Sequence, residues 1–158
     1  MQDRAIVLDA KLISEPLNVG IDQAALEAVR KLVVKKGEKK KGRINLLGLN
    51  ILMKDWTTIV SEFTHMFALM GLEVVCPLCA GSTVAQIRES ADSELNVIMC
   101  PEYALETSKY YAEELGVPSV GLDYSPVGFD ATIELLRKVA EAAGVDAKPA
   151  VDDVLSVR

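Results

Sequence analysis

Apolar residues occur along this chain in short continuous runs that alternate with longer segments in which they recur every three or four positions. The short runs predict β-strands at 5–8, 43–49, 72–76, 95–99 and 119–122. The longer segments predict helices at 22–34, at 55–70, after position 82, at 102–115 and at 129–143. Such an alternation is typical of the α/β class. We expect a doubly wound, mostly parallel, Rossmann-like sheet with helices on both faces, giving three αβα layers.

Polar residues and glycines mark the ends of the predicted helices. Residues 9–18 are predicted to be a loop, after which Asp22, Asp55 and Ser82 are expected to be helix N-caps. Three glycines follow helices at the position where a left-handed backbone is common: Gly71, Gly116 and Gly144. The helix that begins near Asp55 carries a long apolar stripe, which predicts a buried face: Trp56, Ile59, Val60, Phe63, Phe67 and Met70.

The length of 158 residues is typical of one domain. Residues 1–42 are predicted to form an N-terminal strand, a helix and a lysine-rich connector, and residues 43–144 the Rossmann-like core. The connector at 35–41 holds five lysines; we interpret it as solvated, with a docking patch for an acidic partner as the alternative. The tail at 145–158 is predicted to begin a linker helix toward a further domain, so we expect a fragment of a longer protein or a short relative of one.

Charge and cysteine content limit the classes of function. The formal net charge of −6 argues against nucleic acid as the main partner, because proteins that bind duplexes present a basic face. No run of residues reaches membrane-spanning length, and no secretory pattern precedes the first apolar run. With three cysteines in such a chain, we expect a cytoplasmic protein whose thiols are free or bound to metal.

All three cysteines fall at or just after the carboxyl ends of two consecutive predicted strands. Ligands of open α/β sheets bind outside this edge, although strand order decides whether Cys76, Cys79 and Cys100 share one site. A redox Cys-x-x-Cys pair, a zinc site, an iron–sulfur site completed by a partner, and simple burial as small apolar residues all remain open. His65 follows Glu62 at a spacing found in some metal sites, but it lies opposite the apolar stripe, and we interpret it as solvated.

Glycine-rich nucleotide fingerprints and Walker loops do not occur in the sequence. The segment Gly81-Ser82-Thr83, and also Gly128, precede predicted helices whose N-terminal amides are able to bind an anion. These two positions are weak candidates because helix N-termini are common.

A series of short motifs resembles the middle domain of the nitrogenase component 1 family. That family includes molybdenum–iron protein subunits, cofactor-assembly scaffolds and dark-operative tetrapyrrole reductases. The motifs extend over about residues 14–144 and are, in order, Asn45-Leu-Leu-Gly-Leu-Asn50 with Asp55-Trp56, Met70-Gly-Leu-Glu-Val-Val75, Gly81-Ser82-Thr83 with Ile87, Leu95-Asn-Val-Ile-Met-Cys100, Glu113-Glu-Leu-Gly-Val-Pro118, and Pro126-Val-Gly-Phe-Asp-Ala-Thr-Ile133 with Leu136-Arg137.

The resemblance implies specific roles for a few residues. Cys100 matches the thiolate that anchors the iron–sulfur–metal cofactor in cofactor-bearing subunits, whereas Cys76 and Cys79 match no family ligand. Gly20 matches a glycine before a helix whose first residues, in nitrogenases, include a histidine beside the cofactor. Ile21 and Asp22 stand at these places, a difference that argues against dinitrogen reduction. The predicted cofactor-binding residues are Cys100, Gly20, Gly81 and Ser82, and the predicted metal ligand is Cys100, with Cys76 and Cys79 as additional candidates.

The function implied is that of a nitrogenase-like oxidoreductase in which low-potential electrons reach a metallocluster or a tetrapyrrole. An iron–sulfur or iron–sulfur–metal cluster is expected in the intact protein. The expected partners are a homologous subunit and an ATP-dependent iron–sulfur reductase, and self-association is also compatible with the pattern; nucleic acid and membrane are not expected partners. We expect the isolated 158 residues to be inactive. Two alternatives are an assembly scaffold for a metallocofactor and a small metal-binding module built on the three cysteines.

Overall fold

Four parallel strands form the centre of the molecule in this computed structural model, which describes residues 14–33 and 37–157. The strands are β1 (Lys40–Leu47), β2 (Glu73–Pro77), β3 (Ser93–Ile98) and β4 (Ser119–Gly121), in the spatial order β2-β1-β3-β4. The chain therefore moves from β1 to one edge, and then returns past β1 to build β3 and β4. The predicted strand at 5–8 lies outside the described residues.

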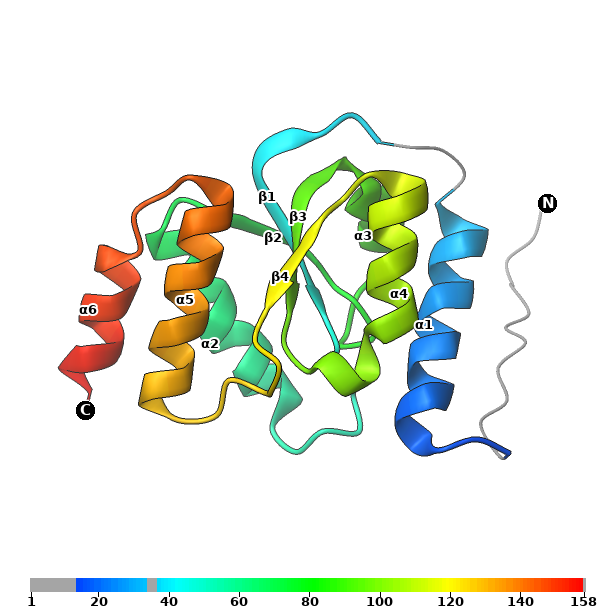
Figure 1. Cartoon of the computed structure of the whole chain (residues 1–158), viewed down its shortest axis with the longest axis horizontal. Coiled ribbons are helices and arrows are strands. Elements are labelled where there is room, and N and C mark those ends of the chain that lie inside the picture. The colour runs from blue at the N-terminus through cyan, green and yellow to red at the C-terminus, as the bar shows by residue number, and fades with distance from the viewer. Residues whose placement is uncertain (1–13, 34–36, 158) are drawn as a thin grey trace.

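Helices cover both faces of the sheet, so the predicted three-layer fold is confirmed (Figure 1). On one side lie α2 (Trp56–Leu69), α5 (Phe129–Ala143) and α6 (Lys148–Ser156). On the other side lie α1 (Leu17–Leu32), α3 (Val84–Glu89) and α4 (Leu105–Tyr110). Three short helices complete the chain: η1 (Ser90–Asp92), η2 (Pro101–Tyr103) and the π-helical turn η3 (Tyr111–Leu115) that continues α4.

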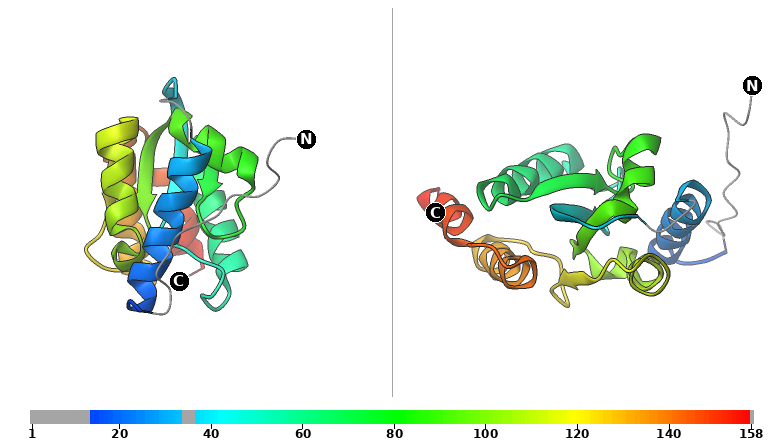
Figure 2. Two further views of the ribbon diagram at one scale, coloured as in Figure 1. Left: turned by 90° about the vertical axis from the view of Figure 1, so that its right-hand side faces the viewer. Right: turned by 90° about the horizontal axis from the view of Figure 1, so that it is seen from above.

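Two apolar clusters hold the layers together, one on each face of the sheet. Neighbouring strand residues point to opposite faces, so Leu46 joins the cluster under α2 and α5 whereas Leu47 joins the cluster under α1 and α4. Most of the predicted apolar stripe of α2 is in the first cluster, where Phe63, Phe67 and Met70 are buried. Helix α6, at the opposite end of the molecule from α1, packs against α2 and α5 (Figures 1 and 2).

A buried polar network lies between the two central strands. Asn45 Nδ2 of β1 donates hydrogen bonds to Asn96 Oδ1 of β3 at 2.8 Å and to the Ser90 carbonyl at 2.9 Å. Its own Oδ1 accepts a hydrogen bond from Ser93 Oγ at 3.0 Å. Asn45, Ser90, Ser93 and Asn96 are fully buried. Because a buried polar group is costly unless it is paired, this network favours one register between β1 and β3.

Two of the three predicted N-caps are wrong. Helix α1 begins at Leu17, directly after Pro16, because proline has no N–H to lose at a helix start; Asp22 therefore lies inside the helix, and positions 17–18 are helical rather than loop. Thr83, not Ser82, caps α3, because its side chain forms a reciprocal pair with Gln86. Asp55 is at the N-cap of α2 as predicted, although its carboxylate accepts no capping hydrogen bond.

The remaining boundaries differ from prediction by small shifts at the polar ends of elements. Strand β1 begins at Lys40, so the last lysines of the predicted connector belong to the sheet, and positions 34–36 of that connector lie outside the described residues. Gly71, Gly116 and Gly144 have positive φ after their helices, as predicted. Within the described ranges, none of the helices combines the length and the apolarity needed to cross a bilayer.

Candidate functional site

The carboxyl ends of β1 and β3 lie side by side, and the chain leaves them in opposite directions. After β1 it passes to α2 on one face of the sheet, and after β3 it passes to α4 on the other face. This is a topological switch point, where the diverging connections leave a crevice that binds ligands in open α/β sheets. Cys100 lies at this point, shortly after the end of β3.

The backbone around Cys100 touches the end of β1. Met99 N donates a hydrogen bond to the Leu47 carbonyl at 2.8 Å, which extends the pairing of the two strands. A Cβ atom added to Gly48 would lie 2.3 Å from the Cys100 carbonyl oxygen. Gly48 also has φ +87°. Only glycine satisfies both conditions without strain, so Gly48 allows the two backbones to approach this closely.

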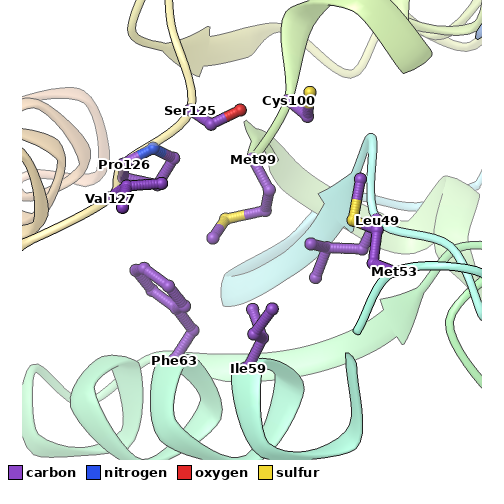
Figure 3. Close-up of a pocket in the computed structure, with 9 residues that line it drawn as sticks. All are labelled: Leu49, Met53, Ile59, Phe63, Met99, Cys100, Ser125, Pro126 and Val127. Atoms are coloured by element: carbon purple, nitrogen blue, oxygen red, sulfur yellow. The ribbon is translucent and has the colours of Figure 1, made fainter. Parts of the chain in front are cut away.

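A pocket of about 400 Å³ opens at the switch point (Figure 3). Its volume lies within the range of small-molecule sites. The lining residues come from the loop after β1, from α2, from the end of β3 and from the loop after β4: Leu49, Met53, Ile59, Phe63, Met99, Cys100, Ser125, Pro126 and Val127. Apart from the Cys100 thiol and the Ser125 hydroxyl, these side chains are apolar.

The lining residues divide into a buried floor and an open mouth. Met99, which is 2% exposed, extends its side chain into the centre of the pocket toward Phe63 (Figure 3). Val127 is 82% exposed and lies at the mouth. Cys100 lies at the rim, 8% exposed, with its sulfur directed away from the Met99 and Phe63 side chains. The site therefore combines an apolar wall with a single thiol at its edge.

The structure does not bring the other two cysteines into this pocket. Cys76 is fully buried in β2, and both it and Cys79 pack with the cluster on the α1 and α4 side. Strands β2 and β3 flank β1, which separates their axes by roughly 10 Å. Across residues 14–33 and 37–157, no group of three or more histidine, cysteine, aspartate or glutamate side chains is placed to hold a metal ion. A site shared by all three cysteines is therefore not preformed.

Burial keeps the thiols of Cys76 and Cys79 protonated. Burial raises the pKa of Cys76 to about 12, and a hydrogen bond with the Ser82 side chain only partly opposes this effect. Burial, together with the nearby Asp22 carboxylate, raises the pKa of Cys79 to about 11. Since the thiolate is the form that attacks electrophiles and binds metals, neither group is activated at neutral pH.

Gly81 and Ser82 do not line the pocket. A Cβ atom at Gly81 would lie 2.8 Å from the Trp56 ring, and φ is +80° there, so glycine is needed for packing. The Ser82 side chain lies beside the Cys76 thiol and lowers its pKa, which burial raises more strongly. The capping box occupies the N-terminus of α3, since Thr83 Oγ1 accepts from Gln86 N at 3.2 Å. A cofactor role for Gly81 and Ser82 remains a prediction.

Gly20 and Asp22 lie on α1, beside the segment that follows Cys100. Gly20 is buried in the first turn of α1, outside the pocket. Asp22 is 4% exposed and accepts hydrogen bonds from the backbone N–H groups of Glu106 and Thr107 at the start of α4. Sequence reasoning missed this contact. The available signal was the lack of any capping side chain at Ala104, directly before α4.

His65 is exposed on α2, as predicted. Its side chain is 57% exposed, and Nε2 lies 3.7 Å from Asp153 Oδ2 of α6. Glu62 is also exposed and lines a separate shallow groove between α2, α5 and α6. The pair is therefore on the outer side of the layer, away from the Cys100 pocket.

Comparisons with known proteins agree on one family. A sequence model described as "Nitrogenase component 1 type Oxidoreductase" matches residues 4–154. One subunit of the light-independent protochlorophyllide reductase of Heliobacterium modesticaldum is 25% identical over 146 residues, covering 92% of this chain and 28% of the relative. The corresponding subunit of the Roseobacter denitrificans enzyme is 29% identical over 136 residues, covering 86% of this chain and 26% of the relative.

The fold also matches solved structures. A structure titled "Nitrogenase Cp1 at pH 5" superposes with a TM-score of 0.70 at 21% identity, covering 89% of this chain and 28% of that chain. A second, "Nitrogenase Cp1 at pH 6.5", has the same TM-score of 0.70 at 19% identity. The chain spans about a quarter of the length of the curated relatives it matches.

Proposed function

The chain belongs to the nitrogenase component 1 type oxidoreductase family, and from this membership we propose that it forms the middle portion of a nitrogenase-like oxidoreductase. In this proposal the residues that line the Cys100 pocket form one side of the site where low-potential electrons reach a metallocluster or a tetrapyrrole. A homologous subunit and a reductase component would be the partners of the intact protein. The short coverage of the relatives supports the view that other parts of a longer polypeptide complete the site.

The observation that carries the proposal is the position of Cys100 at the rim of an apolar pocket, at the switch point of the sheet. Cysteine thiolates are the usual protein ligands of iron–sulfur groups, so Cys100 fits the role of a single anchoring ligand. One thiolate cannot hold a large cluster alone, and the remaining ligands would have to come from elsewhere.

The walls of the pocket favour a tetrapyrrole over a cluster as the group in contact with this chain. Phe63, Met99 and Pro126 present apolar surface of the kind that packs against a flat macrocycle. The names of the curated relatives point the same way, since protochlorophyllide is a tetrapyrrole. A macrocycle bound over this buried floor would exclude water, which would strengthen electrostatic interactions with the bound group. A tetrapyrrole would supply the conjugated system that accepts the electrons.

Two binding measurements on the 158-residue chain test the proposal. The first is anaerobic incubation with ferrous iron and sulfide, followed by ultraviolet–visible absorption, for the wild type and for Cys100→Ser. The second is fluorescence titration with protoporphyrin IX as the tetrapyrrole, for the wild type and for Val127→Asp, which places a charge at the pocket mouth. We expect the porphyrin to bind the wild type, with an affinity about tenfold lower in Val127→Asp. Any iron that the wild type takes up should be lost in Cys100→Ser.

Matched variants make these outcomes specific. Cys79→Ser changes a half-buried thiol outside the pocket, and Val84→Asp changes an exposed valine on α3, also outside the pocket. Both should bind as the wild type does. The proposal is wrong if the wild type binds neither iron nor porphyrin, or if these controls lose as much binding as the pocket variants.

A further inference from the structure

Helix α4 begins without a capping side chain of its own. Ala104 stands at the N-cap, with φ −141° and ψ 12°, and makes no side-chain capping bond. Alanine is a poor N-cap because it has no acceptor for the free N–H groups of the first turn. These groups are not left to solvent, since Thr107 in this turn is only 1% exposed.

Asp22 of α1 supplies the missing cap from a distant part of the sequence. Its Oδ2 accepts a hydrogen bond from Glu106 N at 2.7 Å. Its Oδ1 accepts from Thr107 N at 3.1 Å and from Thr107 Oγ1 at 2.6 Å. Thr107 Oγ1 also lies 3.1 Å from the Asp22 carbonyl oxygen. A carboxylate at this position is favourable because it interacts with both the N–H groups and the positive end of the helix dipole.

Only a short segment separates this contact from Cys100. Residues 101–104 form a compact turn in which Tyr103 N donates to the Cys100 carbonyl at 3.2 Å and Ala104 N donates to the Pro101 carbonyl at 3.3 Å. Asn18 of α1 also donates to the Glu102 carbonyl at 3.4 Å. Gly48 contacts the Cys100 backbone from the other side. Cys100 is therefore held between β1 and a turn that is fastened to α1.

We propose that Asp22 is a positioning residue for the Cys100 thiol: by capping α4 across the fold, it fixes the turn at 101–104 and thereby holds Cys100 at the rim of the pocket. Asp22 would thus restrict the motion of residues 100–104, and this role rests on the proposed function only in taking the Cys100 pocket as the functional site. Its prediction is that loss of the Asp22 cap opens the Cys100 segment without unfolding the rest of the chain.

The rate at which each cysteine reacts with iodoacetamide, resolved by peptide mass spectrometry, tests this prediction. Cys76 is fully buried on the other cluster and reports on global unfolding. Asp22→Asn keeps the shape of the side chain, but its amide sets a donor against the N–H groups of α4. This variant is compared with wild-type protein in enough urea to give the same free energy of unfolding. Urea promotes global unfolding far more than local openings, because local openings expose little surface.

At matched stability we expect Cys100 to react about tenfold or more faster in Asp22→Asn than in the wild type, since several bonds to a charged group are lost. Cys76 should react equally fast in both. Thr107→Val keeps the backbone donor but loses the hydroxyl, so the Cys100 reaction rate should rise by less than in Asp22→Asn. Thr107→Ser keeps the hydroxyl and should react at the wild-type rate. If Asp22→Asn does not fold, the Cys100 reaction rates of Thr107→Val and Thr107→Ser are compared instead.

Asp146→Asn is the matched control, because Asp146 accepts one backbone hydrogen bond, from Lys148 N at 2.9 Å, at the start of α6. It should leave Cys100 reactivity unchanged at matched stability. Equal Cys100 rates in Asp22→Asn and stability-matched wild type, together with no effect of Thr107→Val, would overturn the inference. Failure to bind iron or porphyrin would overturn the proposed function and leave this result unaffected.

Discussion

Replacing Gly48 by alanine probes the contact between β1 and the Cys100 segment. The new methyl group would lie 2.3 Å from the Cys100 carbonyl oxygen and 2.8 Å from its nitrogen, distances that require a backbone shift. The positive φ of +87° adds a conformational penalty for any residue with a Cβ atom. The conformational part costs about 1–2 kcal/mol. Overpacking in a rigid region adds about 1–3 kcal/mol.

We therefore expect Gly48→Ala to lower the free energy of unfolding by about 2–5 kcal/mol, which is a large part of the stability of an ordinary domain. Urea unfolding followed by circular dichroism measures this change. Gly144→Ala is the matched control, since Gly144 has φ +67° but no atom within 4 Å of an added Cβ. Its cost should be the conformational part alone, about 1–2 kcal/mol.

The difference between the two variants isolates the steric contact at the switch point. If Gly48→Ala costs no more than Gly144→Ala, then β1 and the Cys100 segment are not in the tight contact described above. A second readout is the reactivity of Cys100 toward iodoacetamide, which should rise in Gly48→Ala because the backbone shift needed to relieve the contact falls on Cys100 itself. It should remain at the wild-type level in Gly144→Ala.

Two further predictions concern the sheet and the buried thiols. Asn45→Ala removes one hydrogen-bond partner each from Ser93 Oγ, Asn96 Oδ1 and the Ser90 carbonyl, and urea unfolding should show a free energy of unfolding lower by about 3 kcal/mol. Asn18→Ala, which loses one bond of 3.4 Å, should cost far less, and equal costs would refute the role of the network. Burial raises the pKa of Cys76 from 9.0 to about 12, so above pH 9 the unfolded state loses this proton first and stability falls with rising pH. Each thiol with a raised pKa contributes up to about 1.4 kcal/mol per pH unit to the slope of the free energy of unfolding against pH. Cys76→Ser should therefore lose stability less steeply than the wild type above pH 9. Identical slopes would contradict the conclusion that the Cys76 thiol is buried and protonated.

Much of the fold could be predicted because the strands and most helices carry clear apolar patterns. The apolar run at 95–99 predicts strand β3, and the structure adds Ser93 and Glu94, whose polar side chains give no signal. Ser93 joins the strand by pairing with Lys40 of β1, and the Glu94 side chain accepts a hydrogen bond from Gly42 N at 2.6 Å. Both are contacts between distant positions. The predicted start of α1 is wrong for a related reason. Asp22 resembles a local cap, but its carboxylate is used by α4, and sequence spacing does not report such distant contacts.

The candidate site could be predicted only in part. Placing Cys100 at the open edge required only that β1 and β3 be parallel, which the pattern indicated. The pocket itself depends on how the loop at 125–127 folds over α2, and no periodicity governs loops. The burial of Cys76 in the cluster on the α1 and α4 side, away from Cys100, could not be predicted either. The spacing of residues shows that Cys76 ends a strand, but not which neighbours bury it.

The division of the pocket into a buried floor and an open mouth has an evolutionary consequence. Met99 is buried and hydrogen-bonded to the end of β1, so its replacement would disturb the core. Ser125, Pro126 and Val127 belong to the surface loop between β4 and α5. If the pocket binds a ligand as proposed, substitutions in that loop would change which molecule it accepts at little cost to folding. Related proteins with this fold would then differ in ligand through residues 125–127, while the buried residues beneath the pocket stay the same.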